Sequence, residues 1–412
     1  MRILPFAAAM VLAASCYNSN VYLSGNGVAL PLAGDSGARA LRLSAVSETV
    51  VRLEISALDS FPQRRSLVIE PQAPFSGYKA RCKKHSVSLE TSSLKVTAGQ
   101  DGSVRLRDKV RGRTLLRSLG ECLSMRPVTV EGKTGYAWSV VFSTGTGEPL
   151  YGLGQQQTLE LDHRGSDEDL YQYNTKISLP FIAGDGWAML WDSYSQGRWG
   201  NPECLQLGEV FKLYDKDGKS GSLTGSYFIK DAQTPFVRNE DSLFFENELA
   251  VKKLPPLPLK GARVEYDGYL EAPRTGDYHF ILYYAGYQKL SLGGEELVSE
   301  RWRAAWNPNS YRFTAHMSEG EKVPLHLEWL PDGDVSYLGL RVSPLYAHQD
   351  DITISAEMDP EIDIYLIAGE RHDDLIASYR RLTGRARLIP RWALGFWQSR
   401  EPIPATPWRS KS

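Results

Sequence analysis

The chain has 412 residues, which is enough for two or three domains. Its 47 basic and 49 acidic residues leave a formal net charge of -2, so the overall charge gives no reason to expect nucleic acid or an anionic membrane as a partner. Aromatic residues are abundant, with 10 Trp and 21 Tyr. Most of them are expected in the core, although exposed aromatic rings also suit stacking on the apolar faces of sugar rings.

Residues 1–16 have the pattern of an export signal. Met1-Arg2 gives a positive start, Ile3–Ala14 is apolar, and small residues precede Cys16. The apolar stretch is too short to span a bilayer. The pattern resembles a bacterial lipoprotein signal, in which Cys16 is lipidated and becomes the mature N-terminus. An ordinary signal peptide cleaved nearby is the alternative. We therefore expect export to the periplasm or outer membrane of a Gram-negative bacterium, with membrane contact only through a lipid anchor.

The other cysteines are Cys82, Cys122 and Cys204. Their number is odd and no CxxC spacing occurs, so neither a zinc site nor a full disulfide framework is indicated. We predict that all three are buried free thiols.

From Leu41 to Thr144 the sequence alternates apolar and polar residues in short runs that are separated by turn signals. Val51–Ile55 and Trp138–Phe142 are two such runs. This pattern is typical of antiparallel strands that fold into a sandwich. Tyr151–Gln155 follows, and its two glycines allow a tight bend.

Acidic residues occur in two places after this region. The run Asp167-Glu168-Asp169 is predicted to be a solvated loop. Asp192 follows an aromatic strand and is predicted to be a turn residue rather than a catalytic carboxylate.

The pattern changes near Lys216, where a new block of alternating strands begins, and Ile352–Ile367 then resumes the earlier type. This order predicts that one sandwich is inserted into another. The predicted organisation is a signal peptide at 1–16, an N-terminal β-sandwich at 17–214 and 346–370, and an inserted β-sandwich at 215–345.

A helix is predicted over Arg371–Leu382, because Ile376, Tyr379 and Leu382 recur at a helical spacing and Gly384 follows as a stop. The apolar run Trp392–Trp397 then predicts a strand that is buried on both faces, which is typical of a parallel sheet. Such a strand needs partners that return through long crossovers. Residues 371–400 are therefore predicted to be a linker helix and the first strand of a further domain, and 401–412 an aberrant tail.

Local motifs for chemistry are weak. Asp215-x-Asp217-Gly218 lacks the other ligands of a calcium loop, and Gly218-Lys219-Ser220 lacks the first glycine of a phosphate loop, so both are predicted to be solvated turns. No metal, no cofactor and no catalytic pair of carboxylates is predicted from spacing.

Six segments in register resemble the N-terminal part of glycoside hydrolase family 31, which includes α-glucosidases and α-xylosidases. These segments are Tyr151–Gln155, Tyr173–Phe181, Gly186–Tyr194, Ile364–Gly369, Tyr379–Gly384 and Ile389–Trp397. The resemblance implies a mainly β fold: a galactose-mutarotase-like N-terminal sandwich with an insert, followed by the first helix and strand of a truncated (β/α)8 barrel.

The insert resembles the lectin-like β-sandwich of anthrax protective antigen, in the stretches Leu223–Phe228, Gly268–Tyr278 and Leu290–Gly294. In family 31, such an insert resembles that of α-xylosidases that act on xyloglucan oligosaccharides. The resemblance implies that Trp302 and Trp306 contact sugar, with buried packing as the alternative. Calcium-dependent sugar binders of this type use adjacent aspartates in a loop, and no such pair can be placed here.

The resemblance also implies a retaining mechanism, in which two aspartates lie roughly 5–5.5 Å apart on later barrel strands. No residue of this sequence matches either aspartate. The resemblance implies two substrate-binding residues. Asn174 lies in a loop that the sandwich contributes to the pocket, and Arg400 follows the first barrel strand.

The chain is therefore expected to be the N-terminal part of an exported, xylosidase-like α-glycosidase and to be inactive without the catalytic barrel. A frameshift or truncated gene model would explain the missing barrel. Its expected partner is an oligosaccharide or polysaccharide, and no nucleic acid. A non-catalytic carbohydrate-binding surface lipoprotein is the alternative.

Overall fold

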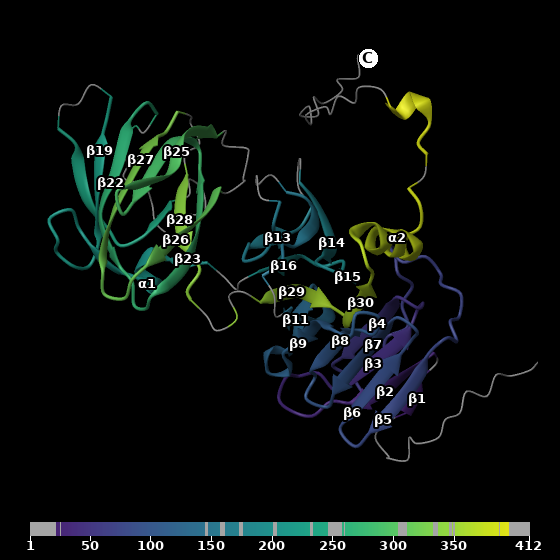
Figure 1. The fold of residues 1–412 in the computed structure, drawn as a ribbon. Helices are drawn as coiled ribbons and strands as arrows, with labels where there is room; N and C mark the ends of the chain where they lie inside the picture. The colour runs from purple at the N-terminus through teal and green to yellow at the C-terminus, as the bar shows by residue number, and fades with distance from the viewer. Residues whose placement is uncertain are drawn as a thin grey trace, which may run out of the picture.

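The computed structural model describes most of the chain between Tyr22 and Leu394. The described residues are 22–24, 26–144, 147–156, 161–172, 176–200, 204–230, 234–245, 258, 260–303, 311–332, 337–345, 348, 351–386 and 388–394. They form two β-rich bodies, which we call the first and second sandwich (Figure 1). Helices are few, so the expectation of a mainly β protein is confirmed.

One layer of the first sandwich is an eight-stranded antiparallel sheet. Its strands, in sheet order, are β1 (Tyr22–Ser24), β2 (Gly27–Pro31), β3 (Ala40–Ala45), β4 (Val50–Ser56), β30 (Ile362–Ala368), β15 (Trp187–Trp191), β14 (Ile177–Ala183) and β12 (Tyr151–Gln155). Every residue of β30 and β15 is buried, because one face packs on the second layer and the other is covered by helix α2 (His372–Thr383). Apolar runs of this kind are expected where a strand is covered on both sides.

The other layer of the first sandwich is a ten-stranded sheet. Its order is β13 (Glu168–Leu170), β16 (Gly197–Trp199), β29 (Ile352–Asp359), β11 (Lys133–Ser143), β9 (Thr114–Ser118), β8 (Val104–Asp108), β7 (Leu94–Gly99), β6 (Ser86–Glu90) and β5 (Lys79–Lys83), and β10 (Ser124–Val130) pairs with β11. Its strands alternate buried and exposed residues, as expected for a sheet with one solvated face. A short 3₁₀ helix, Gly120–Cys122, connects β9 and β10.

The second sandwich has its own core and two sheets. The smaller sheet contains β17 (Leu205–Gln206), β28 (Leu338–Val342), β23 (Gly276–Tyr284), β26 (Tyr311–Met317) and β21 (Leu243–Phe245). The larger contains β20 (Phe236–Glu240), β19 (Leu223–Phe228), β22 (Arg263–Glu271), β27 (Lys322–Leu330), β24 (Gly286–Leu292), β25 (Glu295–Arg303) and β18 (Lys212–Tyr214). The short helix α1 (Leu207–Val210) follows β17. These sheets thus begin at β17, ahead of the predicted boundary at residue 215.

The second sandwich leaves and re-enters the first between two neighbouring strands. β16 precedes it in the chain, β29 follows it, and the two pair in one sheet. The backbone N–H of Gly200 also donates a hydrogen bond to the carbonyl of Thr353 (2.9 Å).

Helix α2 matches the predicted helix to within a residue or two at each end. Gly384 ends it with a positive φ of 80°, which glycine adopts without strain. The predicted apolar stripe is partly wrong: Leu375 and Leu382 are buried, whereas Ile376 is 44% exposed. Both choices fit a helical period, and only the position of the sheet decides between them.

The predicted strand after this helix is wrong where the structure describes it. Arg391–Leu394 form a 3₁₀ turn, closed by a hydrogen bond from the N–H of Ala393 to the carbonyl of Pro390, and Trp392 is 77% exposed. No strand of the described residues pairs with this segment, and an apolar run without a paired neighbour has no reason to extend. Residues 395–400 and the tail 401–412 lie outside the described ranges.

The cysteine prediction holds only in part. Cys204 is buried and Cys122 half-buried, and both are free thiols, but Cys82 is disulfide-bonded. A sequence without paired cysteine motifs gives no information on such a long-range link. Within the described ranges, no helix is long and apolar enough to cross a bilayer.

Candidate functional site

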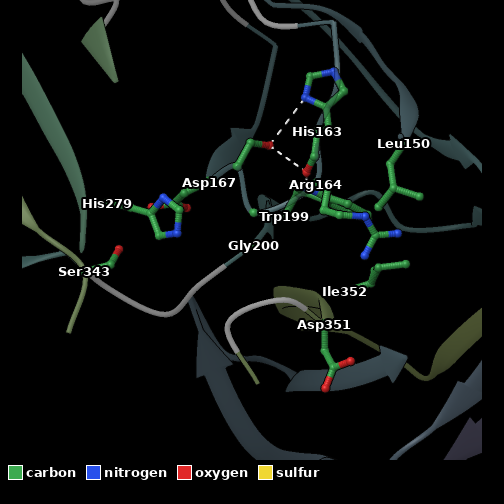
Figure 2. Close-up of a pocket in the computed structure, with 12 residues that line it drawn as sticks. Leu150, His163, Arg164, Asp167, Trp199, Gly200, His279, Ser343, Asp351 and Ile352 are labelled. Atoms are coloured by element: carbon green, nitrogen blue, oxygen red, sulfur yellow. Dashed lines mark hydrogen bonds between the residues drawn. The ribbon is translucent and has the colours of Figure 1, made fainter. Parts of the chain in front are cut away.

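A pocket lies where the two sandwiches meet. Residues 163–167, Trp199 and Gly200 line it from the first sandwich, and His279 and Ser343 line it from the second (Figure 2). Its volume of about 10 Å³ leaves room for roughly one water molecule. It adjoins a larger polar cavity of about 240 Å³, to which Asp162, Arg164, Arg312 and Thr314 also contribute.

His163, in the wall of this pocket, has a structural environment. Its side chain is buried, and its carbonyl accepts hydrogen bonds from the Trp199 indole (2.9 Å) and from the Ser166 hydroxyl (3.0 Å). The Ser166 hydroxyl also lies 3.4 Å from Nδ1 of the His163 ring. Burial lowers the pKa of His163, so the ring is neutral at pH 7 and serves packing rather than charge.

The acidic run beside this pocket is not the solvated loop that the sequence predicted. Asp167 and Glu168 are 4% and 2% exposed. Asp167 accepts two hydrogen bonds from Arg198 (2.9 and 2.6 Å), and Arg312 of the second sandwich lies 3.6 Å from Asp167 and 3.8 Å from Glu168. Lys176 approaches Glu168 at 4.0 Å. Buried carboxylates need such partners, because an unpaired buried charge is strongly unfavourable.

We call Asp167, Glu168, Arg198 and Arg312 the ionic joint. Burial acts against the charge on Arg198, but Asp167 outweighs it and raises the pKa of Arg198 above its ordinary value. Cys204 also contacts the joint. Its thiol donates a hydrogen bond to Asp167 (3.4 Å) and lies 3.3 Å from the Ser343 hydroxyl. The joint therefore fixes one sandwich against the other, and its carboxylates are committed to cations rather than free for acid–base chemistry.

A second group of buried carboxyls lies within the first sandwich. Its members, which we call the acidic cluster, are Glu54, Asp192, Glu361 and Asp363, and they face Arg42, Arg52 and Arg64. Their side chains are at most 1% exposed, so no substrate reaches them. Asp192, predicted to be a turn residue, thus belongs to a buried ion-pair network.

Charges in the acidic cluster do not balance, because four carboxyls face three guanidinium groups. Arg52 binds Asp363 through two hydrogen bonds (2.8 and 2.7 Å), whereas both carboxyl oxygens of Glu361 lack a hydrogen-bond partner among the described residues. Burial, with Glu54 and Asp363 nearby, raises the pKa of Glu361 to about 8. Glu361 therefore holds a proton at neutral pH.

Exposed aromatic side chains occur on the outer face of the larger sheet of the second sandwich. Trp302 on β25 is 49% exposed and Tyr287 on β24 is 41% exposed. The two residues are direct cross-strand partners, so their rings lie on the same face. The Trp302 indole N–H donates to Asp332, which leaves its ring face available for stacking.

The other implied binding residues cannot be placed. Asn174, Trp306 and Arg400 lie outside the described residues, as does Cys16. Sequence reasoning missed Tyr287, although the alternation of Gly286–Leu292 puts Tyr287 on the outward side of its strand. Among the described residues, no group of three or more His, Cys, Asp or Glu has the geometry to hold a metal ion.

Comparison with known proteins gives the context for these features. A solved structure of a family 31 α-xylosidase from Xanthomonas citri superposes with a TM-score of 0.82 at 29% identity, over 92% of this chain and 42% of that one. An α-xylosidase from Saccharolobus solfataricus is 53% identical over 45 residues, or 11% of this chain and 6% of the relative. A family 31 glucosidase from Pseudescherichia vulneris is 38% identical over 63 residues, or 15% of this chain and 12% of the relative.

No family model matches the chain. The chain spans less than half the length of each of these relatives, and the coverage is consistent with their N-terminal part. The resemblance drawn from the six sequence segments is confirmed by both the fold and the aligned residues. This protein is a homologue of the family 31 glycoside hydrolases of α-xylosidase type, over part of their length.

Proposed function

We propose that this chain forms the N-terminal sandwich and the lectin-like insert of a retaining α-xylosidase that acts on xyloglucan oligosaccharides. The observation that carries the proposal is the superposition of 92% of the chain on the Xanthomonas α-xylosidase at 29% identity. The fold of the two sandwiches and of the connection between them therefore resembles that of an α-xylosidase.

The described part supplies support rather than catalysis in this proposal. A retaining mechanism needs two carboxyls roughly 5–5.5 Å apart on either side of a substrate. The buried carboxyls of the ionic joint and the acidic cluster are instead closed to solvent and lie beside arginines. We expect the 412-residue chain alone to leave α-xylosides intact.

A surface that could receive the rest of such an enzyme is present on the first sandwich. Tyr151, Ile177 and Leu179 on β12 and β14 are 43%, 46% and 42% exposed. Ile376 on α2 is also exposed, and the Tyr151 ring contacts His372 at the start of α2. Because β12 and β14 are paired, Tyr151, Ile177 and Leu179 lie on neighbouring strands, and exposed apolar side chains on one sheet are typical of a protein–protein contact.

The second sandwich would bind the substrate at Trp302 and Tyr287. Two half-exposed aromatic rings side by side on a sheet offer a flat apolar surface to successive sugar rings. The carboxylate of Asp332 beside Trp302 would accept hydrogen bonds from sugar hydroxyls.

Two assays test the proposed enzyme. The purified chain is incubated with p-nitrophenyl α-xyloside and α-glucoside, and no release of nitrophenol is expected. A chimera then joins this chain to the remaining length of the Xanthomonas enzyme, and α-xyloside hydrolysis is expected. Turnover by the chain alone, or a folded chimera that prefers the α-glucoside, would contradict the proposal.

Sugar binding is tested separately by calorimetry with xyloglucan oligosaccharides. Trp302→Ala should weaken binding roughly tenfold or more, because it removes a stacked ring. Trp392→Ala is the matched control, since it removes an exposed tryptophan that lies outside the second sandwich. If Trp302→Ala binds the oligosaccharides as tightly as the wild type does, Trp302 is not part of the binding site. Tight binding together with an inactive chimera would favour the non-catalytic carbohydrate-binding function.

We further propose that the protein is exported. The pattern of residues 1–16, with a positive start, an apolar stretch and small residues before Cys16, supports export.

A further inference from the structure

The solvated face of the ten-stranded sheet carries an unusual number of cations. The residues that point outward on β5 to β9 include seven basic ones: Lys79, Arg81, Lys83, Lys95, Arg105, Arg107 and Arg117. We call these seven the basic face. Six of them are exposed and Lys95 is half-buried. A chain with a net charge of -2 therefore has a strongly asymmetric charge distribution.

Strand register brings these cations together. Arg105 lies directly opposite Arg117 on the next strand, and Lys95 lies directly opposite Arg107. Like charges in directly opposed positions destabilise a sheet. These two pairs therefore carry an unfavourable energy that a bound anion would relieve.

The protein itself supplies little compensation. In the described part of the chain, none of the seven cations forms an ion pair with a carboxylate. One acid, Glu90, points outward opposite Lys79 and Lys95, and its carboxylate is also bound by Lys109 at 2.8 Å, so a single acid faces seven cations. The face is therefore open to an anionic partner.

Protection of a sheet edge does not account for the pattern. Lysines often guard edge strands against pairing with another chain, and β5 is such an edge. Lys95, Arg105 and Arg117 instead lie on β7, β8 and β9, which have neighbours on both sides.

We propose that the basic face docks the protein on the anionic headgroups of a phospholipid bilayer. The cations spread in two dimensions over five adjacent strands, which suits a planar array of phosphates. Apart from Glu90 and Gly99, the other outward residues are serines and threonines that can donate to phosphate oxygens: Ser86, Ser88, Thr97 and Thr114. This proposal rests neither on the glycosidase function nor on a lipid anchor.

The face lacks the features of a nucleic-acid site. Single-stranded nucleic acids bind where aromatic rings stack on bases, and no aromatic side chain points outward from β5 to β9. Proteins that bind the minor groove of a duplex often insert apolar side chains between base steps, and no large apolar side chain points outward from β5 to β9.

Vesicle flotation tests the proposal with the full chain. Vesicles of phosphatidylglycerol and phosphatidylcholine in equal parts should carry the protein at low salt, and vesicles of phosphatidylcholine alone should not. Each cation near an anionic surface strengthens binding roughly fivefold, so Arg105→Glu with Arg117→Glu should weaken it at least about 30-fold. High salt should release the protein.

Two control variants show whether a loss of vesicle binding comes from the charge of the basic face, from the net charge of the protein or from misfolding. Lys216→Glu with Lys219→Glu changes the net charge equally on an exposed turn of the second sandwich and should leave binding intact. Arg105→Lys with Arg117→Lys keeps the charge and should also bind. The proposal is overturned if wild-type protein does not float, if the face and turn variants behave alike, or if a DNA duplex binds the face more tightly than the vesicles do.

Discussion

Glu361 gives the sharpest test of the physical reasoning, because it is buried in a group that contains more carboxyls than arginines. The perturbation is Glu361→Gln, which keeps the shape of the side chain and removes its charge. Burial disfavours its ionisation most, Glu54 and Asp363 add to this effect, and Arg64, 3.8 Å away, favours ionisation. Arg52 also favours it, but Arg52 is engaged by Asp363.

The sign of the effect follows from proton binding. The pKa of Glu361 is about 8 in the folded protein against an ordinary value of 4.5, so between these pH values the folded state holds a proton that the unfolded chain has lost. The free energy of unfolding therefore falls as pH rises through this window. At 1.36 kcal/mol for each pKa unit, the difference corresponds to about 5 kcal/mol as an upper bound above pH 8.

The assay is urea unfolding at several pH values between about 5 and about 9, followed by tryptophan fluorescence. Hydrogen exchange of peptides from β4 and β30 assigns the transition to the first sandwich. Glu361→Gln should resemble the wild type near pH 5 and become more stable than it by several kcal/mol near pH 9. Glu357→Gln, an exposed change on β29, is the control and should not alter the slope. Parallel profiles for wild type and Glu361→Gln would refute the reasoning.

Three further outcomes are expected. Arg312→Ala should loosen the ionic joint, because it removes the cation that the second sandwich contributes. Hydrogen exchange in residues 163–170 should become faster, and the distribution of interatomic distances from small-angle X-ray scattering should broaden. Lys289→Ala breaks an exposed pair with Glu296 (2.9 Å) and should change neither measurement. Leu375→Ala should lower the free energy of unfolding by about 2–5 kcal/mol in urea titrations, and Ile376→Ala by less than about 1 kcal/mol, because only Leu375 is buried. Cys16→Ser should abolish palmitate labelling in a bacterial host while the mature protein is still exported; unchanged labelling would exclude the lipoprotein signal.

Local sequence patterns predicted those features that depend on neighbours in the chain. Alternation identified the strands, and a helical period with Gly384 located α2. The choice between Leu375 and Ile376 as the buried residue could not be made, since both are apolar and the covering sheet comes from distant segments.

Features built from distant residues were missed. Asp167 and Glu168 look solvated in sequence because their partners, Arg198 and Arg312, lie far along the chain. Likewise, Arg105 and Arg117 look scattered until the register sets them side by side. The net charge was an equally poor guide, because it sums the basic face with the acidic residues of the whole chain.

The attachment of the second sandwich at β16 and β29 has an evolutionary consequence. Since the chain departs and returns at adjacent, paired strands, the whole module can be excised or exchanged as a cassette without breaking another strand pairing of its host. A short linker from Gly200 to Ile352 would restore an uninterrupted sheet. The first sandwich could thus acquire or lose the second one in a single recombination event while its own core stays unchanged.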